Sequence, residues 1–222
     1  MNRGFYTIMA AQFFSSLADN ALLIVAISVL VSLQAPAWMT PMLKLFFVLS
    51  YVILAPFVGA FADAFPKGRV MFITNLVKIT GCLMMFFSVH PLLAYAVVGF
   101  GAAAYSPAKY GILTELLPAE KLVAANGWIE GLTVLSIIFG TVLGGVLVSE
   151  RLAQALAFLV PFNHLQLSLS LEFALGVVML AYILAAVFNL NIPDTGARYA
   201  AQKRHPLKLV VEFSECFITL WR

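Results

Sequence analysis

The strongest constraint on this chain is a series of six apolar segments, each long enough to cross the hydrocarbon core of a bilayer. Such a crossing takes about 20 predominantly apolar residues in an α-helix. The segments span residues 8–33, 42–62, 70–89, 92–110, 127–148 and 167–190. Soluble domains are about 25% charged, whereas only 10% of these residues are charged and 63% are hydrophobic. We therefore predict an all-α, multi-pass membrane protein.

The remaining stretches predict how the chain is divided. Residues 191–206 include the most hydrophilic part of the sequence, and residues 207–222 begin a seventh apolar pattern. We predict a six-helix bundle over 1–190, a cytoplasmic linker over 191–206 and the beginning of a seventh transmembrane helix over 207–222. Residues 111–126 are polar enough to leave the membrane, and we expect a short surface helix there.

Basic residues predict the orientation, because lysine and arginine are enriched in cytoplasmic loops. With the N-terminus inside, only Lys44 and Arg151 fall on the outer side. We therefore predict a cytoplasmic N-terminus. Nine residues fall on or near the inner side: Arg3, Lys67, Arg69, Lys109, Lys121, Arg198, Lys203, Arg204 and Lys208.

One carboxylate, Asp19, interrupts the first apolar segment near its middle. A charge at the centre of a bilayer costs about 2.5–3.5 kcal/mol even on the lenient insertion scale, and it defaults to a functional role. The segment's polar residues recur at spacings of three and four and share one helical face: Gln12, Ser15, Ser16 and Asp19, with Asn20 beside them. We predict a functional face there; a structural charge is the alternative.

The fourth apolar segment carries a charge of opposite sign, Lys109, shortly after Pro107. Proline inside a helix kinks or breaks it, and a lysine beyond such a break makes a good anion site. We expect Lys109 to be the first partner of Asp19, although snorkelling to the surface is the alternative for this lysine. Lys78 is expected to snorkel to the cytoplasmic surface. Glu130 could pair with either Lys109 or Lys78.

Six helices followed by a basic loop are typical of one half of a twelve-helix transporter. Such halves nest two inverted three-helix repeats, and the site lies where the leading helices of the repeats meet. Here the leading helices are the first and the fourth, which carry the opposite charges. The chain lacks a phosphate-binding Gly-x-x-x-x-Gly-Lys-Ser/Thr loop, a His-x-x-x-x-Asp pair and a serine nucleophile elbow. We expect neither an ATPase nor an acyltransferase, and no cofactor, metal or nucleic acid.

The connection between the second and third segments resembles the signature loop of the major facilitator superfamily. Gly59 is followed four residues later by Asp63, and then by the basic residues Lys67 and Arg69. Gly59 would let a neighbouring helix approach closely. Asp63 would pair with Lys67 or Arg69, or cap a helix across the interface between halves, so we expect these residues to form a gate. The loop departs from the usual pattern at Ala64, Pro66 and Gly68.

More specific fragments, Ala-Asp-Asn-Ala-Leu-Leu at 18–23 and Ala-Ala-Tyr-Ser-Pro-Ala-Lys-Tyr-Gly at 103–111, closely resemble the bacterial lysophospholipid transporters of the inner membrane. The resemblance implies the N-terminal half of such a transporter, which needs a C-terminal half as partner. It implies movement of lysophosphatidylethanolamine and lysophosphatidylglycerol from the outer to the inner leaflet without ATP. The resemblance further implies that a cytoplasmic acyl-carrier-protein synthetase/acyltransferase re-acylates these lysolipids at the inner leaflet.

The resemblance also places Asp19 and Lys109 in the path of the lipid head group. We expect Lys109 to bind the phosphate and Asp19 the ammonium, or the two to pair when the site is empty. Asn20, Gln12 and Tyr105 are expected to complete this substrate site.

Two alternatives stay open on the same sequence. One is a proton-coupled permease for a small solute or drug, with Asp19 as its protonation site. A glycine-rich stretch in the fifth segment resembles the motif of proton-coupled antiporters, but Ser136 and Thr141 replace its Gly and Pro. The other alternative is a membrane scaffold that docks the acyltransferase through the basic residues 198–208.

Overall fold

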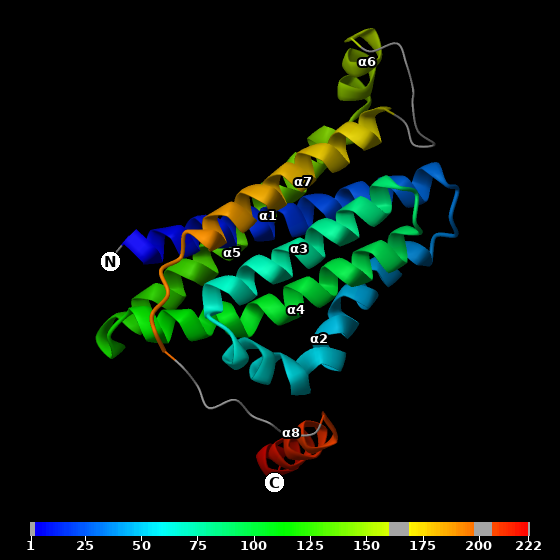
Figure 1. Ribbon diagram of the computed structural model, residues 1–222. Coiled ribbons are helices and arrows are strands. Elements are labelled where there is room, and N and C mark those ends of the chain that lie inside the picture. Colours follow the sequence, from blue (N-terminus) through cyan, green and yellow to red (C-terminus); the bar gives the residue numbers. More distant parts are fainter. Residues whose placement is uncertain (1–2, 160–168, 198–205, 222) are drawn as a thin grey trace.

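The computed structural model describes residues 3–159, 169–197 and 206–221, and within them every regular element is a helix. Helices α1 to α5 and α7 pack together, and α6 and α8 lie at the periphery (Figure 1). The helices are α1 (Arg3–Ser32), α2 (Met39–Ala64), α3 (Lys67–Phe86), α4 (Pro91–Leu116), α5 (Ala119–Leu147), α6 (Glu150–Leu159), α7 (Leu169–Leu190) and α8 (Pro206–Trp221).

Six of these helices are long and apolar enough to cross a membrane, namely α1 to α5 and α7. This confirms the six predicted spans. The expected surface helix within 111–126 is wrong, because α4 continues to Leu116 and α5 begins at Ala119. Pro118 disfavours a helical conformation in the residue before it, so the interruption is confined to Leu117 and Pro118.

The fourth segment was predicted to kink or break at Pro107. Helix α4 is continuous through this proline, so the helix does not break there. A proline removes one backbone hydrogen bond, and packing outweighs that loss here. Gly99 and Gly101 let α4 approach its neighbours closely. A Cβ atom at Gly99 would lie 2.8 Å from the Phe47 carbonyl oxygen of α2, and one at Gly101 would lie 2.7 Å from the Thr74 carbonyl oxygen of α3.

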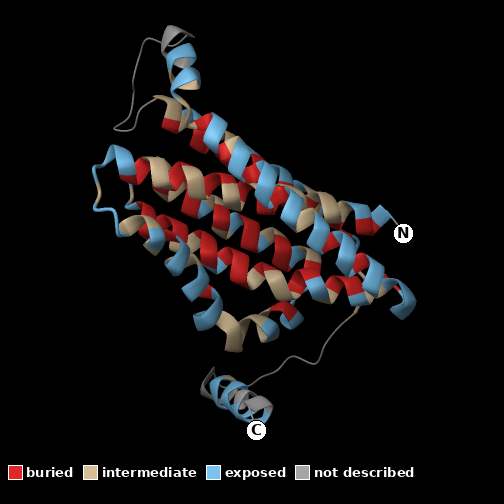
Figure 2. Cartoon of the chain, turned by 180° about the vertical axis from the view of Figure 1, so that it is seen from behind, coloured by how far each residue is buried: buried red, intermediate tan, exposed pale blue. Residues whose placement is uncertain are grey.

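Packing is uneven around the bundle. Helix α1 packs against α5 and α7, α3 packs against α4 and α7, and α2 packs mainly against α4. Helices α2 and α5 have the smallest buried fractions among the six spans, and Figure 2 shows exposed residues along their outer faces. These two helices are therefore the flanks of the bundle that the described residues leave open.

Two buried apolar clusters fill the two ends of the bundle. One cluster contains Val29, Leu43 and Met85, and the other contains Ile8, Val70 and Ile112. Buried polar side chains of α1 and α3 come from the turns between these clusters, namely Gln12, Ser15, Ser16, Thr74, Asn75 and Lys78. The bundle thus has a polar layer between two apolar ends.

The start of α1, the α2–α3 and α4–α5 connections and the segment after α7 meet at one end of the bundle. A Cβ atom at Gly4 would lie 3.1 Å from Pro193, and one at Gly68 would lie 3.2 Å from Ile192. This is the end predicted to be cytoplasmic, and its orientation stays a prediction.

Helices α6 and α8 lie at the periphery of the bundle. Helix α6 was not predicted, and α8 covers most of the predicted start of a seventh span. Within the predicted linker, residues 198–205 lie outside the described residues. The three-part division of the chain stays a prediction.

Candidate functional site

The polar layer surrounds a cavity of about 210 Å³, called the central cavity below, which is lined by residues of α1 to α5. Helix α1 contributes the face predicted from its spacing. This face is turned toward the protein interior, and its functional role stays a prediction. Its residues in the lining are Gln12, Ser15, Ser16, Asp19 and Asn20.

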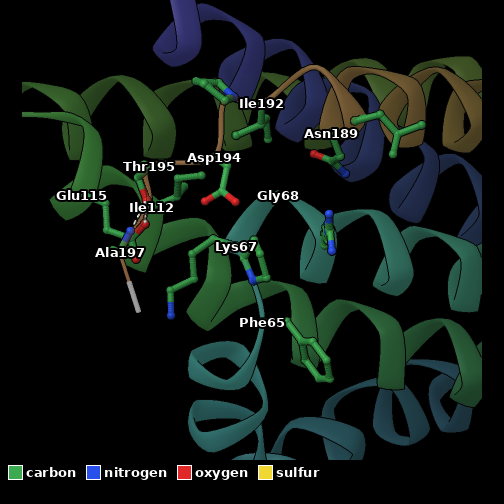
Figure 3. Close-up of a pocket in the computed structure, with 14 residues that line it drawn as sticks. Phe65, Lys67, Gly68, Ile112, Glu115, Asn189, Ile192, Asp194, Thr195 and Ala197 are labelled. Carbon is green, nitrogen blue, oxygen red and sulfur yellow. Dashed lines mark hydrogen bonds between the residues drawn. The ribbon is translucent and has the colours of Figure 1, made fainter. Parts of the chain in front are cut away.

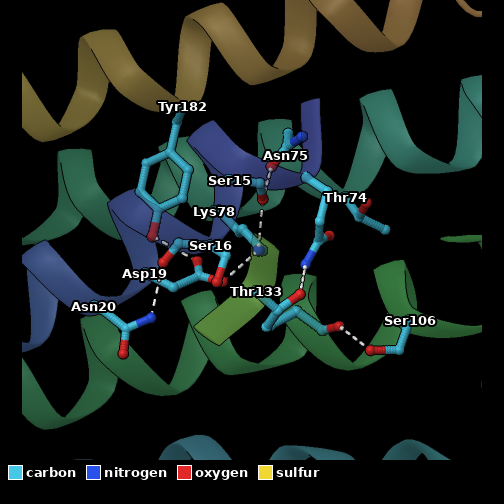
Figure 4. Close-up of polar contacts among 12 residues, drawn as sticks. Ser15, Ser16, Asp19, Asn20, Thr74, Asn75, Lys78, Ser106, Thr133 and Tyr182 are labelled. Carbon is cyan, nitrogen blue, oxygen red and sulfur yellow. Dashed lines mark hydrogen bonds and ion pairs between the residues drawn. The ribbon is translucent and has the colours of Figure 1, made fainter. Parts of the chain in front are cut away.

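Asp19 is held from two directions (Figure 4). The Lys78 ammonium donates a hydrogen bond of 2.7 Å to Asp19 Oδ2, and the Tyr182 hydroxyl donates one of 2.8 Å to Asp19 Oδ1. Lys78 also donates to Ser15 Oγ at 2.9 Å. The carboxylate therefore has a partner on each oxygen.

The prediction that Lys109 is the first partner of Asp19 is wrong, and so is the prediction that Lys78 snorkels to the surface. The Lys78 side chain is only 2% exposed. Gly101 of α4 provides the space for its stem, since a Cβ atom there would lie 2.7 Å from Lys78 Cγ. The ion pair with Asp19 compensates the charge of the Lys78 ammonium inside the bundle, so its side chain does not have to extend to the membrane surface.

Lys109 lies near Glu130. Of the two lysines that the sequence offered as partners of Glu130, Lys109 is therefore the one that pairs with it. Lys109 Nζ is 3.8 Å from Glu130 Oε1, and Glu130 also accepts a hydrogen bond of 2.6 Å from the Tyr110 hydroxyl. The Lys109 side chain is 8% exposed and that of Glu130 is 55% exposed. This pair is long and lies at the rim of the bundle.

The other predicted substrate residues also line the central cavity. Gln12 Nε2 donates to Thr133 Oγ1 at 3.0 Å and thereby joins α1 to α5. Asn20 Nδ2 donates to the Ser16 carbonyl of its own helix at 2.8 Å. The buried Tyr105 hydroxyl has no hydrogen-bond partner among the described residues, and Lys78 Nζ lies 5.2 Å from the centre of its ring.

Sequence reasoning missed three residues around Asp19. Tyr182 binds its carboxylate, the Tyr95 hydroxyl donates to its backbone carbonyl at 3.2 Å, and Lys44 lines the cavity from α2. Tyr182 had a detectable signal, because it is a hydroxyl in the middle of an apolar span. The sequence did not indicate which span would face Asp19.

Of the four predicted gate residues, Asp63 and Lys67 are in contact with each other. Asp63 forms an ion pair with Lys67, as expected for one of its two candidate partners, and Lys67 also donates to the Ala62 carbonyl at 2.9 Å. Arg69 is exposed. None of the described atoms lies within 4 Å of a Cβ placed at Gly59, so the expected close approach of a neighbouring helix stays a prediction. Gly59 belongs to the open flank formed by α2.

A second pocket of about 240 Å³ lies beside the gate residues, between the start of α3, the end of α4 and the segment after α7 (Figure 3). Lys67, Arg69 and Asp194 line it. The Thr195 hydroxyl donates to Glu115 Oε2 at 2.5 Å. This contact ties the segment after α7 to α4.

The sequence model of the Major Facilitator Superfamily matches residues 8–212 of the chain. Over all 222 residues the chain is 41% identical to the lysophospholipid transporter LplT of Yersinia enterocolitica serotype O:8 and covers 50% of that protein. It is 39% identical, with the same coverage, to the lysophospholipid transporters LplT of Yersinia pestis (strain Pestoides F) and Yersinia pseudotuberculosis serotype O:3. The chain spans about half the length of these curated relatives.

Proposed function

We propose a function from one premise: this chain belongs to the Major Facilitator Superfamily. The function is transport of lysophospholipids, with this chain as the N-terminal six-helix half of the transporter. The support is the 39–41% identity over the whole chain to proteins named lysophospholipid transporters. The transporter carries out no chemical reaction on the lipid and uses no cofactor.

The observation that carries the proposal is a charged cavity inside an apolar bundle. Asp19, Lys78 and Lys109 line it from three helices. An apolar groove of about 460 Å³, lined by residues such as Phe13 and Phe139, lies between the same helices α1 and α5 that contribute to the cavity. A charged cavity and an apolar groove on the same two helices suit an amphiphile with one acyl chain and a phosphate head.

The residue roles follow from how tightly each group is already bound. Lys109, whose partner is 3.8 Å away, binds the lipid phosphate. The Asp19 carboxylate already accepts hydrogen bonds from Lys78 and Tyr182, so a substrate ammonium would share it with them, and Asp19 holds Lys78 in place when the site is empty. Tyr105, whose hydroxyl has no partner among the described residues, and the amides of Gln12 and Asn20 supply further hydrogen bonds to the head.

Transport needs a second six-helix bundle against which this one can rock. We place that bundle on the open flank formed by α2 and α5, with Gly59, Asp63, Lys67 and Arg69 as the gate between the halves. The exposed apolar faces of α2 and α5 support this placement.

We further place the protein in the bacterial inner membrane with its N-terminus in the cytoplasm. Lysophosphatidylethanolamine and lysophosphatidylglycerol would move from the outer to the inner leaflet, where a cytoplasmic acyl-carrier-protein synthetase/acyltransferase re-acylates them. The support is the unequal distribution of lysine and arginine between the two sides of the predicted spans.

Lysolipid flux into proteoliposomes tests the proposal. The chain is reconstituted together with the second half of the Yersinia enterocolitica relative, and the same chain without that half is the baseline. We expect flux only with both halves, and a loss of tenfold or more in Asp19→Asn or Lys109→Ala, since each removes a charge-assisted contact. Lys121→Ala, on the exposed surface, is the matched control.

Each alternative has its own outcome in this experiment. Flux of a small solute that follows a proton gradient, without lysolipid movement, would favour a proton-coupled permease. Capture of the acyltransferase by both charge variants, without lysolipid flux in any preparation, would favour a scaffold. Parent-level lysolipid flux in correctly inserted Asp19→Asn and Lys109→Ala proteins would refute the residue roles.

A further inference from the structure

Three buried polar side chains each have one atom without a hydrogen-bond partner among the described residues. They come from three different helices, as Asn75 of α3, Tyr105 of α4 and Asn189 of α7. Their exposed fractions are 0%, 4% and 1%. A buried polar group without a partner is unfavourable, and the apolar interior of a membrane offers no bulk water to compensate it. The three atoms therefore point to a bound polar ligand.

The hydrogen bonds around Asn75 determine which atom of its amide needs a partner (Figure 4). Lys78 donates to Ser15 Oγ at 2.9 Å, so the Ser15 hydroxyl hydrogen is available for another acceptor. That acceptor is Asn75 Oδ1, at 2.8 Å. The amide oxygen is thus occupied, and Asn75 Nδ2 is the donor that has no partner within the described part of the chain.

Asn189 presents the complementary atom. Its Nδ2 donates at 3.1 Å to the Met71 carbonyl, which can only accept, so its amide oxygen is the atom left without a partner in the described structure. The Tyr105 and Asn189 side chains lie close enough to influence each other. The Tyr105 hydroxyl can both donate and accept. The three side chains therefore offer a donor, an acceptor and a hydroxyl.

This mixture of groups indicates the kind of ligand. An anion would meet the lone pairs of the Asn189 oxygen, and a cation would meet the amide hydrogens of Asn75, so neither ion suits all three groups. A water molecule can accept from Asn75 and from Tyr105 and donate to Asn189. Three hydrogen bonds are typical of a buried water. The Tyr105 oxygen can then still accept a hydrogen bond from a lipid head.

The three side chains also link the two cavities of the bundle. Tyr105 lines the central cavity, and Asn189 lines the second pocket beside the gate residues (Figure 3). We infer that Asn75, Tyr105 and Asn189 bind a buried water molecule, and that this water-binding site is a hydrated connection between the second pocket and the central cavity. All three side chains belong to this chain, so the inference requires neither a second half nor a particular substrate.

The water-binding site would join the same helices as the central ion pair, at a second level. At the first level, Asp19 of α1 accepts hydrogen bonds from Lys78 of α3 and Tyr182 of α7. Asn75 lies about one turn from Lys78 along α3, and Asn189 lies about two turns from Tyr182 along α7, both toward the second pocket. A water molecule between Asn75 and Asn189 would therefore link α3 to α7 again, on the side of the second pocket.

Radiolytic labelling of the purified chain tests the inference. A short X-ray pulse splits water into hydroxyl radicals, which oxidise the side chains next to a bound water, and mass spectrometry measures the rate for each residue. Met71 and Met85 are both fully buried. Met71 lies one turn before Asn75 on the same face of α3, whereas Met85 belongs to the apolar cluster at the other end of the bundle. We expect Met71 to be oxidised about tenfold faster than Met85, since apolar interiors stay dry.

Three variants assign the oxidation to the water-binding site. Asn189→Leu replaces the acceptor by an apolar side chain and should lower the Met71 rate to that of Met85. Tyr105→Phe removes only a hydroxyl, so we expect it to fold, and it should lower the Met71 rate about fivefold through the loss of one hydrogen bond to the water. Asn191→Leu is the matched control, because Asn191 is exposed just after α7, and it should leave the rate unchanged.

Rapid mixing with water that carries a heavy oxygen isotope, before the pulse, tests the connection. We expect oxidised Met71 to contain the heavy isotope at the shortest mixing times, because the bound water exchanges through the second pocket. Equally slow oxidation of Met71 and Met85 overturns the water-binding site, and so does a Met71 rate that Tyr105→Phe and Asn189→Leu leave unchanged. Fast oxidation of Met71 without the heavy isotope overturns the hydrated connection.

Discussion

Two lysine–carboxylate pairs of the same chemistry lie at the centre of the bundle and at its rim, in different surroundings. Asp19 and Lys78 are 2.7 Å apart, with side chains 15% and 2% exposed, whereas Lys109 and Glu130 are 3.8 Å apart and Glu130 is 55% exposed. Tyrosine hydroxyls extend both pairs, Tyr182 at the centre and Tyr110 at the rim.

The two ion pairs are expected to differ in how much each contributes to the stability of the folded bundle. A largely buried pair is costly to break, because removal of one partner leaves the other as an uncompensated charge. A pair with one solvent-exposed partner contributes less to stability, because water screens the charge of that partner. The Asp19–Lys78 pair therefore suits holding α1 and α3 together, whereas Lys109 is the lysine of the central cavity that can more easily leave its carboxylate for a charged substrate.

The largest expected effect comes from removing the central carboxylate. Asp19→Ala should lower the free energy of unfolding in detergent by about 3–5 kcal/mol, because Lys78 is left buried without its anion. Glu130→Ala at the rim should cost about 1 kcal/mol or less. The double variant Asp19→Leu with Lys78→Met should regain much of the loss. Equal costs for Asp19→Ala and Glu130→Ala would remove the distinction between the two pairs.

A second test adds one methyl group to α5, either near the centre of the bundle at Gly140 or near the rim at Gly131. A Cβ atom at Gly140 would lie 2.5 Å from the Leu17 carbonyl oxygen of α1, whereas none of the described atoms lies within 4 Å of one at Gly131, beside Glu130. Gly140→Ala should destabilise the protein by about 1–3 kcal/mol through overpacking. Gly131→Ala should be neutral or stabilising, since alanine favours helix. Thermal unfolding of the two variants measures the contrast, and a stabilising Gly140→Ala would contradict it.

A third test removes one hydroxyl from each pair. Tyr182→Phe should cost about 1–2 kcal/mol, because a buried carboxylate loses a hydrogen-bond donor that water cannot replace. Tyr110→Phe removes a hydrogen bond of similar length from an exposed carboxylate and should change stability by less than about 0.5 kcal/mol. The two midpoints of chemical unfolding provide the comparison, and a Tyr110→Phe variant that is as unstable as Tyr182→Phe would refute it.

The smallest expected effect is the response of the rim pair to salt. Mobile ions screen exposed charges within about 3 Å at 1 M salt, and they screen buried pairs much less. The stability difference between the parent and Glu130→Gln should therefore shrink toward zero at high salt. The difference between the parent and Asp19→Ala should persist. A salt-dependent Asp19 effect would show that the central pair is open to solvent.

Periodicity and hydropathy predicted the spans and the buried face of α1, because both depend on residues close together in sequence. The partner of Asp19 could not be predicted in this way. Three lysines line the central cavity, and the one that reaches the carboxylate is determined by the packing of α3 and by the space left at Gly101. The continuity of α4 was missed for a related reason, since contacts with α2 and α3 outweigh the local preference of Pro107.

Asp19 and the two partners of its carboxylate, Lys78 and Tyr182, leave the ribosome far apart in time. Lys78 follows Asp19 by 59 residues and Tyr182 by 163. At about 5–20 residues per second these gaps correspond to roughly 3–12 s and 8–33 s of synthesis. The opposite charge is thus made while the early helices are being inserted, and the hydroxyl arrives only with the last of the six spans. Lys78 is therefore available to Asp19 well before Tyr182, so the charge of the carboxylate can be compensated before its second hydrogen bond can form.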